Sequence, residues 1–182
     1  MNNELFKNFK KNAEVSDELI AKYREKLPTE LISVWKEYGF GSILDGYLKI
    51  INPDEYQEII YMSYFRADVS IPILVTGFGD IITWEKNKYI GIVRYKIGDA
   101  DIISTGFKYF FGDLQDDYFI EEYLEIDKYN EAISLLGKLE YDECFGYVPL
   151  LGLGGSEKVE NLDKVKIKEH IELITLMLGK IE

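Results

Sequence analysis

The middle of the chain, residues 71–105, carries the pattern that most restricts how the chain can fold. Four short runs rich in β-branched and aromatic residues follow one another there, separated by the turn-forming triplets GFG, KNK and IGD. The runs are IPILVTG, DIITWE, YIGIVRY and ADIIST. In the second run, Ile82 and Trp84 alternate with Thr83 and Glu85, as in a strand with one face buried. Connections this short join antiparallel neighbours, so we predict an antiparallel meander.

Helical spacing of apolar residues flanks this region on both sides. Ser16 is a candidate N-cap for a first helix, and a second helix after Pro28 is expected to bury Trp35. A short strand near GYLKIINP and a third helix precede the meander, and no strand is predicted after Phe107. Helical patterns there cover residues 114–126, 128–139 and 165–179. The predicted fold class is α+β, with N-terminal helices and a central antiparallel sheet, followed by a helical C-terminal part packed on it.

The charge balance limits the kind of partner. The 182 residues include 21 basic and 33 acidic side chains, a net charge of −12. Nucleic acids and anionic membranes bind proteins through basic residues, so we expect neither as a partner. A negative field steers toward basic protein surfaces, although many proteins are acidic only for solubility.

Three negative observations favour a cytoplasmic location. The N-terminal residues contain no apolar run of signal-peptide length, and no segment approaches about 20 uninterrupted apolar residues. Cys144 is the only cysteine, so no intramolecular disulfide can form.

The stretch GYVPLLGLGGSE, residues 146–157, raises the question of a phosphate-binding loop. Gly152 and Gly154 fit the start of a dinucleotide fingerprint, but Glu157 occupies the position of the third glycine. A P-loop is excluded because no lysine stands at the required place. We interpret the stretch as a structural turn that seats the final helix, with Gly154 at a position that favours glycine.

Catalytic and metal-binding chemistry has little support. His170 is the only histidine and lies at the edge of an apolar stripe, which is typical of a structural residue. Cys144 and His170 could pair as nucleophile and base, but no oxyanion motif accompanies them. We therefore expect no catalytic, cofactor-binding or metal-binding residues and no enzymatic activity.

One acidic segment stands above the background. Residues 109–127 contain seven acids and no lysine or arginine. If the segment is helical, Asp117, Glu121 and Glu125 share one face at spacings of four. Such a face is either simply solvated or a docking surface for a basic partner. The residues that we predict to bind a partner are Asp113, Asp116, Asp117, Glu121 and Glu122.

Two parts of the sequence resemble known families. The stretch LPTELISVWKEYGFGSILDGYLKIINPDEY, with the later GFGDIITWE and ISTGF, resembles the bacterial GAD-like domain family. The stretch DECFGYVPLLGLGGSEKVENLDKVKIKEHIELI resembles the C-terminal domain of type VI secretion immunity proteins. The resemblance implies two domains, a GAD-like α+β domain at residues 1–112 and a helical domain at residues 113–182.

The resemblance also implies a function. An immunity protein is a small cytoplasmic partner that binds a toxin encoded beside it, and in this secretion-linked branch the toxin is a DNase. The LP…W…YGFG opening is also similar to the start of a second immunity superfamily, which implies the same class of function on a different fold. We therefore predict an immunity protein that neutralises a cognate toxin with a basic surface.

A second class of function stays open. The family name records a distant similarity to an insertion domain of aspartyl-tRNA synthetases and of an amidotransferase subunit. The alternative is therefore a non-enzymatic module that binds a small ligand or serves a translation enzyme. The oligomeric state does not follow from the sequence.

Overall fold

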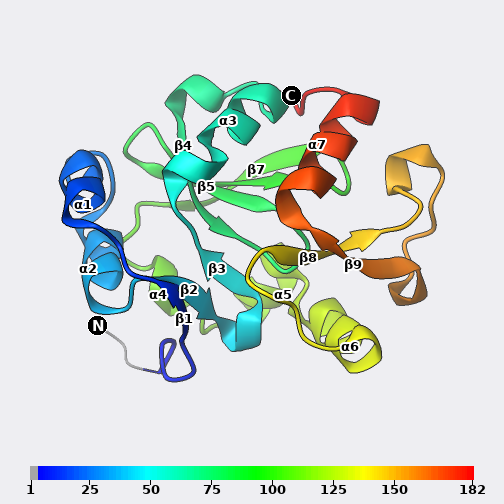
Figure 1. The fold of residues 1–182 in the computed structure, drawn as a ribbon, viewed down its shortest axis with the longest axis horizontal. Coiled ribbons are helices and arrows are strands. Elements are labelled where there is room, and N and C mark those ends of the chain that lie inside the picture. Colours follow the sequence, from blue (N-terminus) through cyan, green and yellow to red (C-terminus); the bar gives the residue numbers. More distant parts are fainter. Residues whose placement is uncertain (1–3) are drawn as a thin grey trace.

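The computed structural model describes residues 4–182 and confirms the α+β class (Figure 1). Seven strands form one sheet in sequence order, and every neighbouring pair is antiparallel. The strands are β1 (Lys10–Ala13), β2 (Phe40–Ile43), β3 (Leu48–Ile50), β4 (Ser70–Val75), β5 (Ile81–Glu85), β6 (Tyr89–Arg94) and β7 (Asp99–Thr105). The predicted meander is therefore correct, and it corresponds to β4–β7.

Helices lie on both faces of this sheet. They are α1 (Asp17–Tyr23), α2 (Thr29–Glu37), α3 (Pro53–Ser63), α4 (Phe110–Asp113), α5 (Asp117–Leu124), α6 (Ile126–Leu136) and α7 (Ile167–Leu178). Ser16 caps α1 as predicted, because its hydroxyl accepts a hydrogen bond from the Leu19 amide at 3.2 Å. Trp35 of α2 is buried, also as predicted.

The strand alternation divides the interior into two apolar clusters. Leu48, Ile50 and Ile82 point into a large cluster shared with α2, α5 and α6. Val75 and Ile81 point to the other face, where α3 and α7 cover the sheet (Figure 1). Both faces are therefore covered, and the apolar residues of successive strands serve one cluster or the other.

The expectation that β5 is half-buried is wrong. All five of its residues are buried, including Thr83 and Glu85. The physical reason is that α3 and the turn after it cover the second face, where the Arg66 guanidinium lies 2.7 Å from a Glu85 carboxylate oxygen. A buried carboxylate is tolerated when a cation and hydrogen-bond donors surround it.

The prediction of helices alone before the short strand near GYLKIINP, and of no strand after Phe107, is also incomplete. β1 lies among the first residues, and β8 (Glu143–Tyr147) pairs with β9 (Leu162–Lys166) in a second, two-stranded sheet. This hairpin attaches to the meander because the Phe145 amide donates to the Gly77 carbonyl at 2.7 Å. A side chain at Gly77 would collide with the Tyr129 ring, so glycine permits this close approach.

The glycine-rich stretch lies within this hairpin. It is a long connection from β8 to β9, and the final helix follows β9 directly. Gly154 has a φ of 89°, which confirms the expected need for glycine there. The stretch joins two strands rather than leading into α7, but it also packs on that helix, because Gly152 lies against Leu178 and Leu150 shares an apolar cluster with Ile171 and Ile174.

The N-terminal and C-terminal parts share their packing. Leu124 and Tyr129 belong to the same apolar cluster as Leu48 of β3, and the Tyr141 hydroxyl donates to the Ile50 carbonyl at 2.6 Å. The division at residues 112 and 113 stays a prediction. None of the helices within residues 4–182 has the length and apolar character needed to cross a membrane.

Candidate partner-binding surface

The five predicted partner-binding acids lie on one short stretch of the chain. Asp113 ends α4, Asp116 and Asp117 begin α5, and Glu121 and Glu122 follow in its middle. Four of them are exposed, and Asp113 is half-buried. We call these five residues the acidic segment.

Two acids of the segment have structural roles. Asp116 is the N-cap of α5 and accepts a hydrogen bond from the Phe119 amide at 2.9 Å. A Glu121 carboxylate oxygen accepts from the Asp127 amide, at the start of α6, at 3.0 Å. Their charges are exposed, but their presence is also explained by the helix termini that they stabilise.

The side chains of Asp117 and Glu122 make no hydrogen bond or ion pair with other residues that the structure describes. Asp113 differs from both, because burial and then the nearby Asp116 raise the pKa of its carboxyl group. Asp117 and Glu122 are therefore the members whose charges are available to a partner with the least effect on folding.

Glu125 does not share a helix face with Asp117 and Glu121, contrary to prediction. Helix α5 ends at Leu124, and Glu125 adopts the left-handed conformation (φ 52°) at the corner before α6. Its carboxylate pairs with Lys96 and with Lys128, and Lys128 also lies 2.7 Å from Glu157 of the glycine-rich stretch. This ion-pair network holds the Glu125 side chain at the corner between α5 and α6, so Glu125 is not one of the free charges.

A groove of about 310 Å³ adjoins the acidic segment. Asp117 lines it together with the carboxylates of Glu4 and Asp45, which come from distant parts of the sequence. Its apolar walls are Leu5, Leu44, Leu114 and Ile120. Such a groove suits a long basic side chain. Its aliphatic part can pack against the apolar walls while its charged group lies near the carboxylates. No local pattern in the sequence connects Glu4 and Asp45 with this segment.

The aromatic residues of the region divide into two groups. Tyr109 and Tyr118 are 69% and 74% exposed. Phe119 is half-buried and packs against Phe110 and Tyr123, at the edge of the large apolar cluster. Exposed tyrosines are the residue type that anchors protein interfaces, so Tyr109 and Tyr118 add to the candidate surface.

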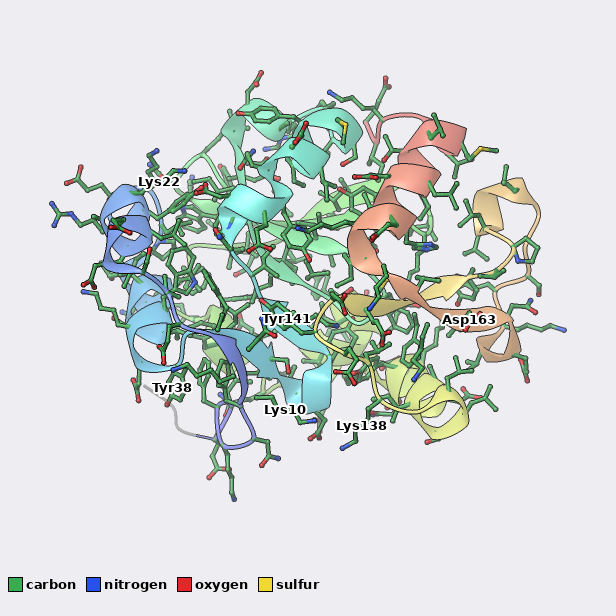
Figure 2. The ribbon with its side chains drawn as sticks, viewed as in Figure 1. Lys10, Lys22, Tyr38, Lys138, Tyr141 and Asp163 are labelled. Atoms are coloured by element: carbon green, nitrogen blue, oxygen red, sulfur yellow. The ribbon has the colours of Figure 1, made fainter. Side chains whose placement is uncertain are left out.

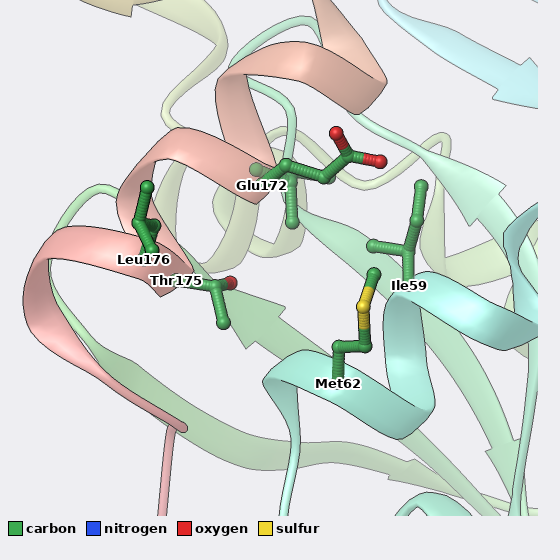
Figure 3. A pocket seen from close by; sticks show the side chains of 6 residues that line it. Ile59, Met62, Glu172, Thr175 and Leu176 are labelled. Atoms are coloured by element: carbon green, nitrogen blue, oxygen red, sulfur yellow. The ribbon is translucent and has the colours of Figure 1, made fainter.

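A second, apolar groove lies between α3 and α7 (Figure 3). It measures about 440 Å³ and is lined by Ile59 and Met62 of α3 and by Ile171, Glu172, Thr175 and Leu176 of α7. Its lining carries one carboxylate, from Glu172, whereas three carboxylates line the groove beside the acidic segment. It is the natural comparison surface for any binding experiment.

The structure places Cys144 and His170 in the interior. Burial raises the pKa of the Cys144 thiol to about 12, so the reactive thiolate is scarce at neutral pH. Burial lowers the pKa of His170, whose ring packs against Gly146. Within residues 4–182 no three His, Cys, Asp or Glu side chains are grouped so that they could hold a metal ion.

Comparisons with known proteins agree with both resemblances. The GAD-like domain model matches residues 2–95, and the model of the C-terminal part of the T6SS immunity protein Tdi1 matches residues 104–178. The crystal structure of Atu4351 from Agrobacterium tumefaciens has a TM-score of 0.74 and 17% sequence identity, covering 96% of this chain and 88% of that chain. At this identity the likeness shows the fold alone. No match is found among curated proteins.

Proposed function

Because the chain belongs to the GAD-like domain family and its C-terminal part matches an immunity-protein family, we propose that it binds and neutralises a cognate bacterial toxin. Neutralisation by binding needs no catalytic residues, so the proposed role is non-enzymatic. The family match suggests the class of function, and the surface described above suggests how the toxin is recognised.

The acidic segment is the observation that carries this proposal. A nuclease binds the phosphates of its substrate with a basic cleft. Exposed carboxylates on one stretch can take the place of those phosphates and speed association by long-range attraction. The partner is therefore a toxin with a basic surface, and a nuclease fits best.

The groove beside the segment gives the contact a specific form. We place an arginine or lysine of the toxin in it, with the charged head near Asp117, Asp45 and Glu4. Tyr109 and Tyr118, near the segment in the sequence and exposed, are the proposed aromatic anchors. The segment then supplies attraction at a distance, and the groove and tyrosines supply close packing.

The net charge of −12 argues against nucleic acid or an anionic membrane as the direct partner. An inhibitor of a nuclease acts where that nuclease meets DNA, so we propose a cytoplasmic location. The alternative, a ligand-binding or translation-accessory module, predicts a small molecule retained in native mass spectrometry and no tight complex with a neighbouring toxin.

The test uses the toxin encoded beside this protein and stopped-flow measurements of association. The variant Asp117→Lys/Glu122→Lys should associate at least about tenfold more slowly and with a weaker salt dependence. These two residues are chosen because their side chains make no hydrogen bond or ion pair with the described part of the chain, and circular dichroism checks α5, whose first turn contains Asp117. Glu58→Lys/Glu172→Lys, on exposed positions of α3 and α7, changes the net charge equally and is the matched control.

Three outcomes would contradict the proposal. Unchanged kinetics in the Asp117/Glu122 variant would remove the acidic segment from the interface. An equal loss in the Glu58/Glu172 control would mean that total charge alone, or the α3–α7 groove, governs binding. Survival of cells that express the toxin without this protein would exclude an immunity role for that pair.

A further inference from the structure

A polar hollow of about 370 Å³ lies between the β1–β3 end of the sheet and the chain before β8. Lys10 of β1, Lys49 of β3 and Lys138, which follows α6, all line it. Figure 2 labels Lys10, Lys138 and Tyr141 around this part of the molecule. The two matched family regions thus meet at this hollow and contribute cations to it from both sides.

Lys49 is the unusual member. Leu48 and Ile50 point into the core, so strand alternation sends the Lys49 side chain to the opposite face. It is 1% exposed, and its only described hydrogen bond is a long one of 3.4 Å to the Gly46 carbonyl. Among residues 4–182, no carboxylate lies within ion-pair distance of its ammonium group. Lysine is almost never buried without such a partner.

The mouth of the hollow adds further positive charge. Lys10 and Lys138 are exposed and have no ion pair within the described part of the chain, whereas Lys11 pairs with Glu14. The lining holds four lysines and two acids, Asp45 and Glu140, so its formal charge is 4 − 2 = +2. This excess stands out in a chain whose net charge is −12.

We propose that this hollow binds a small oxyanion with more than one negative charge, a phosphate ester or a polycarboxylate. Lys49 is the inner ligand, and Lys10 and Lys138 close over the anion from the mouth. An ammonium group supplies three donors and a point charge, which suits oxyanions of several shapes. The volume and the enclosed position of Lys49 fit a small molecule, since ligand pockets measure roughly 300–1,000 Å³. The hollow contains none of the five residues of the acidic segment, and it meets the groove beside that segment only at Asp45, which lines both.

The charge state of Lys49 gives the site a pH signature. Burial lowers the pKa of Lys49 to about 8, opposed by the neighbouring Cys144, Glu143 and Asp142. Asp45, Glu140, Lys10, Lys11 and Lys138 face the same hollow. An anion binds the protonated amine, so its affinity should fall about tenfold from pH 7 to pH 9 as Lys49 loses its proton.

The experiment is calorimetric titration of the full chain with inorganic phosphate, pyrophosphate and citrate at constant ionic strength. We expect saturable binding at one site, weakened at least tenfold in Lys49→Met. Lys10→Gln/Lys138→Gln should bind severalfold more weakly, and Lys36→Met, an exposed lysine on α2, should bind as the wild type does. A preference for the phosphates identifies a phosphate ester as the ligand class, and a preference for citrate identifies a polycarboxylate.

Circular dichroism checks that Lys49→Met is folded. If Lys49→Met does not fold, the exposed variant Lys10→Gln/Lys138→Gln decides the outcome. The proposal is overturned if none of the three anions binds saturably, or if Lys49→Met binds as well as the wild type. Unchanged binding by Lys10→Gln/Lys138→Gln would overturn it equally.

Discussion

The acidic segment and the lysine hollow use charge in opposite ways. In the segment, Asp117 and Glu122 stand in water, where their hydration is retained and their field reaches outward. In the hollow, Lys49 is enclosed and has lost most of its hydration without gaining a carboxylate. Exposed charge is inexpensive for folding and acts at a distance, whereas enclosed charge lowers stability unless a ligand compensates for it.

Glu85 shows that the burial of a charge and the lack of a partner are separate effects. Glu85 is as deeply buried as Lys49, but Arg66, Tyr64 and Thr83 converge on its carboxylate. The Tyr64 and Thr83 hydroxyls lie 3.2 and 3.0 Å from it and can donate hydrogen bonds. If the comparison is correct, removing Glu85 and removing Lys49 should change stability in opposite directions.

The largest effect is expected for Glu85→Ala. The change leaves Arg66 without its counter-ion and two hydroxyls without an acceptor, so it should lower the free energy of unfolding by about 3 to 4 kcal/mol. Chemical denaturation measures this, with Glu58→Ala on the exposed side of α3 as a control that changes it by less than about 0.5 kcal/mol. A small loss for Glu85→Ala would break the distinction between paired and unpaired buried charge.

Lys49→Met, in contrast, is expected to raise the free energy of unfolding at pH 7. The folded-state pKa of Lys49 is about 8, below its ordinary value of 10.5, so folding opposes the charged amine. Below pH 8 both folded and unfolded chains hold the proton, and the wild type bears the full effect. Methionine should therefore raise the free energy of unfolding by up to roughly 3 kcal/mol, since one pKa unit corresponds to about 1.4 kcal/mol.

The stability gain of Lys49→Met over the wild type should shrink as the pH rises. Between pH 8 and 10.5 the unfolded wild-type chain holds a proton that the folded chain has released, so wild-type stability rises across that window. Denaturation at pH 7 and pH 10 checks the trend, and Lys36→Met should show neither the gain nor its loss. If Lys49→Met is less stable than the wild type at pH 7, the amine is held by contacts that outweigh its burial.

The sequence predicted the fold where local patterns are long and regular. The strands β4–β7, the helix that buries Trp35 and the helix that carries the half-buried Phe119 follow from apolar spacing. The strand β1 was missed because its four residues, KKNA, are polar and exposed, and β8 because ECFGY is short and contains glycine. Their place in a sheet comes from pairing with distant segments, which local propensity does not report.

The two sites differ in the same way. The acids of the segment are neighbours in the sequence, so a count of charges found them. Lys10, Lys49 and Lys138 come from three distant parts of the chain, and no local pattern connects them before the fold brings them together. Glu125 shows the limit of reading charges from the sequence. Its assignment to the face of Asp117 and Glu121 required the helix to continue through residue 125, whereas α5 ends at Leu124.

The smallest expected effect is a difference in stability between two members of the acidic segment, Glu121 and Glu122. Glu121→Ala removes the acceptor of the Asp127 amide at the start of α6, so it should lower the free energy of unfolding by about 1 kcal/mol. Glu122→Ala removes a charge of the same sign with no such contact, and its stability should stay within about 0.5 kcal/mol of the wild type. Denaturation and toxin association measured on both variants separate the two roles, because a purely electrostatic contribution slows association to a similar degree in each. Equal stability of the two variants would mean that water replaces the carboxylate at the Asp127 amide. Glu121 would then have no role in stabilising the start of α6.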